Sequence, residues 1–222
     1  MIEHVRNGTV HVVTMKNEQN LLDPPFLARL HKALDEVEAE SESESALVLT
    51  GEGKFFSNGL NLPELMKLEA PAMAQFSTEM ARLAGRLVVS PLPTVAALNG
   101  HAFAGGAVLA LACDYRIMRE DRGWLCFSEV DVGIPIPPRI MALIRAKLPG
   151  TTARDAVLAG KRFSADEAIG AGFADAKAPE AELLAKAVEL AGSLAGKNRN
   201  VFRTMKATLW GDVARGLGVE PD

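Results

Sequence analysis

The feature that most constrains the fold is an alternation of short apolar segments with longer amphipathic ones. Residues 10–15 and 46–50 are rich in β-branched and aliphatic residues, as expected of strands, and residues 24–40 between them place apolar side chains at helical steps of three and four. Later segments have mostly helical patterns. The sequence therefore predicts an α/β core followed by a helical segment. Further strands are expected at residues 94–98 and 113–118, and further helices at residues 71–89, 137–148, 151–159, 164–171 and 180–209.

Composition narrows the class of protein. The 222 residues are 48% hydrophobic and 23% charged with a formal net charge of −4, and no basic stripe is present, so neither nucleic acid nor a membrane is expected as a partner. Cys113 and Cys126 form no CxxC pair and have no histidine at metal-ligand spacing. We therefore expect two buried thiols, no metal site, one principal domain and, without a recognisable targeting segment, a cytoplasmic location.

Two glycine-containing turns and one acid are the candidates for chemistry. Residues 51–60 carry three glycines and two adjacent aromatics, which predicts a loop, and residues 99–106 read Asn-Gly-His-Ala-Phe-Ala-Gly-Gly. Glycine serves tight turns more often than catalysis. Two backbone N–H groups at such turns, facing the carboxylate of Glu129, would nevertheless suit enolate chemistry beside a thioester carbonyl.

Four motifs occur in an order that resembles one known family. They are Phe-Ser-Asn-Gly-Leu-Asn-Leu at residues 56–62, the turn at 99–106, Cys-Asp-Tyr-Arg at 113–116 and Ser-Glu-Val-Asp-Val-Gly at 128–133. This order is similar to that of the crotonase, or enoyl-CoA hydratase/isomerase, superfamily, and most similar to its plant-type Δ3-Δ2-enoyl-CoA isomerases. The resemblance implies a crotonase-like ββα superhelix core at residues 1–177. It also implies a shortened helical C-terminal segment at residues 178–222 and a homotrimer or dimer of trimers.

The resemblance also implies a site. The backbone N–H groups of Leu60 and Gly105 fall at the family's two oxyanion positions, Glu129 falls at the catalytic acid, and Val108 stands where hydratases carry their other glutamate. One carboxylate suits a double-bond shift, which needs a single base that removes and returns a proton. The implied reaction converts 3-enoyl-CoA to 2-trans-enoyl-CoA in unsaturated fatty acid β-oxidation, with coenzyme A as part of the substrate and no separate cofactor. The expected substrate-binding residues are Ser57, Asn58, Gly59, Asn61, Leu62 and Pro135.

Residues beside Glu129 in the sequence suggest how its proton affinity is raised. Phe127, Val130 and Ile134 are expected to desolvate Glu129 and raise its proton affinity. The helical stripe that contains Met73, Phe76 and Met80 is interpreted as core, with the lining of an acyl pocket as the alternative.

Two other functions stay open. A hydratase or thioester hydrolase on the same fold would need Asp131 or Glu64 to replace the acid absent at Val108, and a non-catalytic acyl-CoA-binding protein would need neither. His101 is interpreted as a hydrogen-bonded structural histidine, and His4, His11 and His31 have no acid partner at motif spacing.

Three polar or terminal segments are expected to be peripheral. Residues 40–45 alternate acid and serine and predict a solvated connection, and residues 211–222 predict a weakly structured tail. Four basic residues are expected on a solvated helix face, with the phosphates of coenzyme A as the alternative partner: Lys197, Arg199, Arg203 and Lys206.

Overall fold

A computed structural model describes residues 1–42 and 44–221. Ser43, within the expected solvated connection, and Asp222, the last residue of the C-terminal segment, lie outside the described residues. In that connection, Glu42 and Glu44 are exposed.

The larger sheet has six strands in the order β1-β2-β3-β5-β7-β9. The first two form an antiparallel hairpin, and each later neighbour is parallel. Strands that are buried on both faces need near-continuous apolar sequence, which explains the composition of residues 46–50. The strands are β1 (Ile2–Asn7), β2 (Val10–Met15), β3 (Ala46–Gly51), β5 (Thr94–Leu98), β7 (Tyr115–Arg119) and β9 (Ala176–Ala178).

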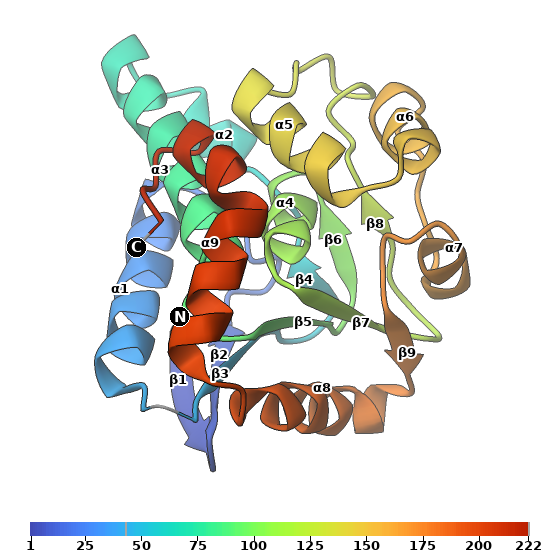
Figure 1. Cartoon of the computed structure of the whole chain (residues 1–222). Helices are drawn as coiled ribbons and strands as arrows, with labels where there is room; N and C mark the ends of the chain where they lie inside the picture. Colours follow the sequence, from blue (N-terminus) through green and yellow to red (C-terminus); the bar gives the residue numbers. More distant parts are fainter. Residues whose placement is uncertain (43, 222) are drawn as a thin grey trace.

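The smaller sheet contains three short parallel strands in the order β4-β6-β8. They are β4 (Phe55–Ser57), β6 (His101–Phe103) and β8 (Leu125–Cys126). Along the chain, each of β3, β5 and β7 joins the larger sheet, the next strand joins the smaller sheet, and a helix follows (Figure 1). This threefold repetition of strand, strand and helix confirms the predicted α/β fold with a ββα superhelix.

Helices cover both faces of the larger sheet. α8 runs along one face, where its alanines pack on Val48, Val95 and Ile117. On the other side, α1, α3 and α4 enclose the main core, which contains Phe26 and Leu83. The helices are α1 (Pro24–Glu40), α2 (Leu62–Leu65), α3 (Ala70–Val88), α4 (Gly105–Ala112), α5 (Pro138–Lys147), α6 (Gly150–Leu158), α7 (Ala165–Gly170), α8 (Glu180–Ala195) and α9 (Arg199–Gly216).

Three elements differ from the sequence predictions. The sequence did not predict β1, because its mixture of charged and apolar residues conceals a strand that pairs on one edge only. β4 occupies part of the expected loop at residues 51–60. The single helix expected at residues 180–209 is two helices, since the chain turns at Gly196 and Asn198 caps α9 by accepting a hydrogen bond from the N–H of Val201 at 3.1 Å.

The weakly structured tail expected at residues 211–222 is wrong for the described residues. α9 continues to Gly216, Leu217 is buried, and the N–H of Val219 donates to the carbonyl of Ala214 at 2.9 Å. Val219 packs where Gly85 of α3 has no side chain. The tail thus folds back onto α3 because a glycine leaves space for it.

The C-terminal segment shares its packing with the core. The boundary proposed between residues 177 and 178 falls inside β9. The solvated face expected for the basic residues of α9 is wrong for Lys206, which is 5% exposed and donates to Oδ2 of Asp114 at 2.7 Å. Lys197 is exposed as expected.

The cysteines and the helices both bear on the class of protein that the composition predicts. Cys113 and Cys126 are buried free thiols, as predicted, and burial raises the pKa of each to about 11. Across the described ranges, no helix combines the length and the apolar character that crossing a bilayer requires.

Candidate active site

The three residues implied in catalysis follow the three strands of the smaller sheet. Leu60 lies shortly after β4, Gly105 after β6 and Glu129 after β8. Parallel strands bring their carboxyl ends to one edge of a sheet, which is where ligands bind in α/β folds. All three residues line one cavity of about 280 Å³. The fold therefore brings together groups that are far apart in sequence.

The first turn directs the N–H of Leu60 away from the neighbouring backbone. Leu22 donates its N–H to the carbonyl of Gly59 at 2.8 Å and accepts the N–H of Asn61 at 2.9 Å. In such a parallel bridge the peptide N–H of the central residue, Leu60, points to the opposite side. Among the described residues, it has no acceptor.

The second turn leads directly into α4. Ala104 adopts φ 47° and ψ −117°, a conformation that a non-glycine residue rarely adopts, and its N–H donates to the carbonyl of Cys126 at 2.8 Å. Gly105 is the first residue of α4, where helical N–H groups have no partner in the preceding turn. Its N–H has no acceptor within residues 1–42 and 44–221, and the helix macrodipole favours negative charge at this position.

Glycines hold the two turns in contact. Gly59 has φ +85°, and a Cβ there would lie 2.9 Å from the carbonyl oxygen of Phe103. A Cβ on Gly106 would lie 2.5 Å from the carbonyl oxygen of Ser57. Any side chain at either position would separate the turns, so the two glycines set the spacing between the free N–H groups.

Glu129 lines this cavity and has one carboxylate oxygen that is unpartnered among the described residues. It lies in the turn between β8 and α5, and its Oε2 is buried without a hydrogen-bond partner in the described part of the chain. Burial raises the pKa of Glu129 above its ordinary value, and the only opposing contribution is a hydrogen bond from its own backbone. A carboxylate in this setting is a stronger base than an exposed one.

The expected neighbours of Glu129 are only partly correct. Ile134 lines the cavity beside it, and Phe127 is fully buried. Val130 is wrong as a desolvating neighbour, because it is 49% exposed and lies close to Gly160.

The cavity walls come mainly from helices that are distant in sequence. Met73, Phe76 and Met80 of α3 line it, so the stripe contributes both to the core and to the pocket wall. Val108 is 3% exposed and also faces the cavity, and Glu129 is the only carboxylate among the described lining residues. The remaining lining residues are Leu62, Leu65, Met66, Ser77, Pro137, Arg139 and Ile140.

Most of the residues expected to bind substrate form hydrogen bonds that hold the first turn. Leu62 lines the cavity. The hydroxyl of Ser57 donates to the carbonyl of Asn20 at 2.7 Å and accepts the N–H of Gly59 at 3.2 Å. The amide of Asn58 donates to Gln19 at 2.7 Å.

Asn61 and Pro135 are also absent from the lining of the cavity. The amide of Asn61 donates to Oδ2 of Asp23 at 3.0 Å, and the other oxygen of Asp23 caps α1. Pro135 is exposed and is not among the lining residues. A substrate-binding role for these residues stays a prediction.

Sequence reasoning missed Asn20, which supports the first turn from below. It is fully buried with φ 49°, and its amide donates to the carbonyls of Phe55 and Phe56 at 3.2 and 3.1 Å. Its Oδ1 accepts the N–H of Asn17 at 2.9 Å. No sequence signal marks its contact with the first turn, because Phe55 and Phe56 lie more than 30 residues away.

The alternative acids do not reach the cavity. Glu64 forms an exposed ion pair with Lys67 at 2.6 Å, and Asp131 approaches Gly160; neither lines the pocket. His101 packs among the rings of Phe103 and Trp124 with centroids 5.3 and 5.1 Å away. Its Nδ1 has no hydrogen-bond partner among the described residues, so the prediction that its ring is hydrogen-bonded is wrong for that atom.

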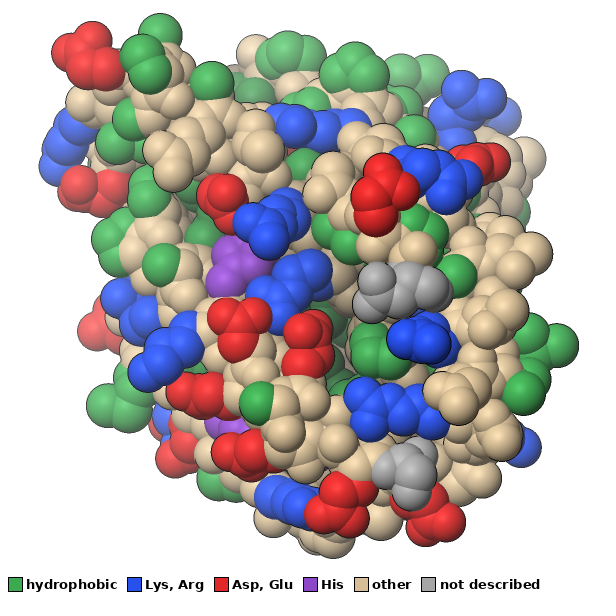
Figure 2. All heavy atoms as spheres, turned by 60° about the vertical axis from the view of Figure 1, so that its left-hand side comes forward, with side chains coloured by type: hydrophobic (Ala, Val, Ile, Leu, Met, Phe, Trp, Pro, Cys, Tyr) green, Lys and Arg blue, Asp and Glu red, His purple; other side chains and the backbone are tan. Residues whose placement is uncertain are grey.

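Other hollows lie on the face formed by α1, α3 and α9, where basic and acidic side chains are interspersed (Figure 2). A cavity of about 600 Å³ between α1 and α3 and one of about 350 Å³ beside α9 share Arg86, which pairs with Asp35 at 2.7 Å and with Glu38 at 3.0 Å. Arg199 and Arg203 line the second cavity, and contact with the phosphates of coenzyme A stays a prediction for them.

Comparison with known proteins decides the family. The profile of the enoyl-CoA hydratase/isomerase family matches residues 5–217. The chain belongs to the enoyl-CoA hydratase/isomerase family. Enoyl-CoA delta isomerase 3 of Arabidopsis thaliana is 36% identical over 219 residues, which cover 95% of this chain and 92% of the plant protein. A putative enoyl-CoA hydratase of Thermus thermophilus is 37% identical over 221 residues, covering 97% and 85%.

The similarity extends to solved structures of the enoyl-CoA hydratase/isomerase fold. Human mitochondrial Δ3-Δ2-enoyl-CoA isomerase superposes with a TM-score of 0.92 at 27% identity, covering 98% of this chain and 86% of the human chain. The predicted family and fold are therefore confirmed. The human protein is described as mitochondrial, and a cytoplasmic location for this chain stays a prediction.

Proposed function

We propose that this protein is a Δ3-Δ2-enoyl-CoA isomerase that converts a 3-enoyl-CoA to the 2-trans-enoyl-CoA, with a place in unsaturated fatty acid β-oxidation. The observation that carries the proposal is that Leu60 and Gly105, whose N–H groups have no acceptor among the described residues, line the same apolar cavity as Glu129, whose Oε2 has no partner there. The delta isomerase name of the Arabidopsis relative supports the same reaction.

In the proposed first step, the thioester oxygen accepts hydrogen bonds from the N–H groups of Leu60 and Gly105. Glu129 removes a proton from C2, and the electrons of that C–H bond pass into the thioester to form a dienolate. The two N–H donors and the N-terminus of α4 stabilise the developing negative charge. Burial raises the pKa of Glu129, which brings the proton affinity of its carboxylate closer to that of the dienolate.

In the second step, the protonated Glu129 delivers the same proton to C4. Electrons return from the oxygen, the double bond forms between C2 and C3, and the carboxylate is regenerated. No water is consumed and no second acid is required, which agrees with Val108 at the cavity wall and with a single carboxylate among the described lining residues. Coenzyme A enters as part of the substrate, and the mechanism uses no other cofactor.

The experiment that tests this function is ultraviolet absorbance with 3-hexenoyl-CoA, because conjugation with the thioester raises the absorbance directly. Wild type should produce a rise, Glu129→Gln should abolish it, and Glu64→Gln should leave it unchanged because that acid pairs with Lys67 at the surface. Folded wild type that produces no rise across several chain lengths would refute isomerisation.

Hydration is the second candidate, because the Thermus relative is named a putative enoyl-CoA hydratase. It predicts that a 2-enoyl-CoA loses its conjugated absorbance in water when the enzyme is added. Asp131→Asn and Glu64→Gln would then reduce the rate. If both variants match wild type, neither residue replaces the acid absent at Val108.

We also propose that the chain assembles as a homotrimer or a dimer of trimers. Val201, Met205 and Leu209 repeat at steps of four along α9 and are 53%, 67% and 66% exposed. A continuous apolar helix face of this kind favours burial against another subunit. Light scattering should give three or six chains per particle, and Met205→Glu should lower that mass.

A further inference from the structure

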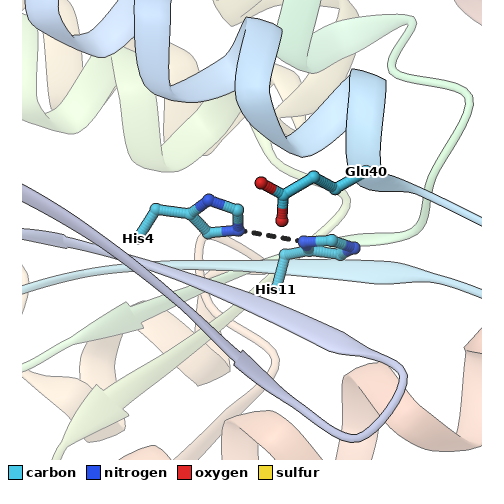
Figure 3. Close-up of side chains that lie close together, drawn as sticks. All are labelled: His4, His11 and Glu40. Carbon is cyan, nitrogen blue, oxygen red and sulfur yellow. Dashed lines mark hydrogen bonds between the residues drawn. The ribbon is translucent and has the colours of Figure 1, made fainter.

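A polar cluster joins the N-terminal hairpin to the end of α1. His4 of β1, His11 of β2 and Glu40, the last residue of α1, point toward one another (Figure 3). Nε2 of His4 is 2.9 Å from Nδ1 of His11, and one ligand atom from each of the three residues lies within 4.8 Å of the others. Glu40 comes from another element, so no sequence spacing marks it beside the two histidines.

The hairpin register produces the cluster. His4 pairs with Val13, and His11 pairs with Arg6, so the two histidines are diagonal neighbours on the face that meets α1. Their rings stack with centroids 5.2 Å apart. Because the strands are hydrogen-bonded along their length, the two ring nitrogens are held close together before any ligand arrives.

Two arginines lie near this end of α1, but neither pairs with Glu40. The last turn of α1 contains Glu40 and no basic residue. Arg6 of the hairpin pairs with Glu42 at 3.1 Å. Nη1 of Arg199 donates to the carbonyls of Ser41 and Glu42 at 3.3 and 2.9 Å, just beyond the helix. Among the described residues, the carboxylate of Glu40 is therefore without an ion-pair partner of its own and is available to a cation.

The contact between the two rings fixes which nitrogens would serve as ligands. Nε2 of His4 and Nδ1 of His11 face each other at 2.9 Å, and metal binding requires a free lone pair on each of them. Ligation through Nδ1 leaves the remaining ring proton of His11 on Nε2, which is buried without a partner in the described ranges.

We propose that His4, His11 and Glu40 bind a divalent transition-metal ion of the zinc class. Nε2 of His4, Nδ1 of His11 and one oxygen of Glu40 would be the ligands, with water in the fourth position. Two imidazoles with one carboxylate are a zinc donor set, whereas magnesium and calcium prefer oxygen ligands. None of the three residues lines the cavity that contains Glu129, so the ion would fasten the hairpin to α1 without a part in the chemistry.

Binding needs local adjustments of the three side chains. Nitrogens bound to one tetrahedral zinc ion are about 3.3 Å apart, so the two imidazoles must give up the proton they share, separate by a few tenths of an ångström and rotate until both lone pairs meet at an ion beside the line that joins the nitrogens. Glu40 is exposed at a helix end, where its side chain can rotate toward the ion.

The test uses Co²⁺ as a coloured probe on the full chain, stripped with a chelator and carrying no polyhistidine tag. Wild type should bind one Co²⁺ per chain with the strong visible absorption of a tetrahedral site, and Zn²⁺ should displace it and raise the melting temperature. Affinity should increase with pH through the histidine range, because protons compete for the same nitrogens.

Variants locate the site. His4→Asn and Glu40→Gln should weaken binding by at least the ~10–100-fold that the loss of an outer-shell partner costs. Glu38→Gln, in the same exposed turn with the same change of charge, should bind like wild type. A wild type that shows only the weak spectrum of hydrated Co²⁺, or variants at His4 and Glu40 that bind normally, would overturn the proposal. If His4→Asn fails to fold, Glu40→Gln decides, and chelation should leave isomerase turnover unchanged in either case.

Discussion

Glu129 and Asp114 are both partly buried acids, but their surroundings differ. Oδ2 of Asp114 accepts hydrogen bonds from the N–H and hydroxyl of Thr94, each at 2.9 Å, and from Nζ of Lys206 at 2.7 Å. Oε2 of Glu129 is buried without a partner in the described chain, and the residue lines an apolar cavity. An oxygen that accepts three hydrogen bonds stabilises the fold, whereas an oxygen without a hydrogen-bond partner can accept a proton from a substrate.

The same contrast separates two adjacent backbone groups. The N–H of Asn61 donates to the carbonyl of Leu22 at 2.9 Å, while that of Leu60 has no acceptor among the described residues. Both peptides belong to one turn. Partnered polar groups therefore build this site, and the unpartnered ones are the candidates for its chemistry.

The largest expected effect is on turnover when Glu129 loses its basicity. Glu129→Gln should lower the isomerisation rate by ~10²–10⁴, the usual contribution of a general base, and should leave the melting temperature equal or higher because a buried unpartnered charge is removed. Asp114→Asn should keep most of the activity per folded molecule. Initial rates with 3-hexenoyl-CoA beside thermal melts measure both, and equal losses of activity would break the contrast.

Asp114→Asn should instead reduce stability. Removing one partner leaves the buried ammonium of Lys206 without its counter-charge, which costs about 3–5 kcal/mol of unfolding free energy. Denaturant titration measures the loss. Asp212→Asn is the matched control, because its exposed pair with Arg215 contributes little, and a similar loss in both variants would contradict the assignment.

The backbone contrast predicts a difference between two substitutions at one position. Leu60→Pro deletes the free N–H and should reduce turnover by ~10²–10³, the cost of one oxyanion donor, whereas Leu60→Ala keeps the N–H and should lose much less. Rates are compared at matched circular dichroism spectra. Two folded variants of equal activity would exclude the N–H of Leu60 from catalysis.

The smallest expected effect is a pH dependence that is specific to Glu129. Because burial raises its pKa in the folded state, turnover should fall as pH decreases through a value above the ordinary glutamate range. The folded chain then binds more protons than the unfolded chain between the two pKa values, so this group lowers stability as pH rises, with a slope of at most ~1.4 kcal/mol per pH unit. Stability is measured by thermal melts of wild type and Glu129→Gln over a range of pH, and the difference between the two pH dependences gives the contribution of Glu129. If the two variants have the same pH dependence, burial does not raise this pKa.

The sequence by itself determined most of the secondary structure and the family, and its motifs marked Leu60, Gly105 and Glu129, which line one cavity. Apolar runs and helical apolar patterns are local, so the strands at residues 10–15 and 46–50 and the helix at residues 24–40 were predicted with nearly their observed bounds. Glycine at residues 59 and 106 also reports a local requirement, since only a missing side chain permits the contact between the turns. A structural requirement that depends on residues close together in the chain can therefore be recognised from the sequence.

Only the tertiary structure decided which groups meet and which are left unpartnered. The walls that bury Glu129 come from α2, α3 and α5 rather than from its neighbour Val130, and Asp114 removes Lys206 from solvent across 92 residues of sequence. The pairing of His4 with His11 follows from strand register. Burial and hydrogen-bond satisfaction are sums over neighbours from distant segments, so no local pattern encodes them, and they set the pKa and availability of each polar group.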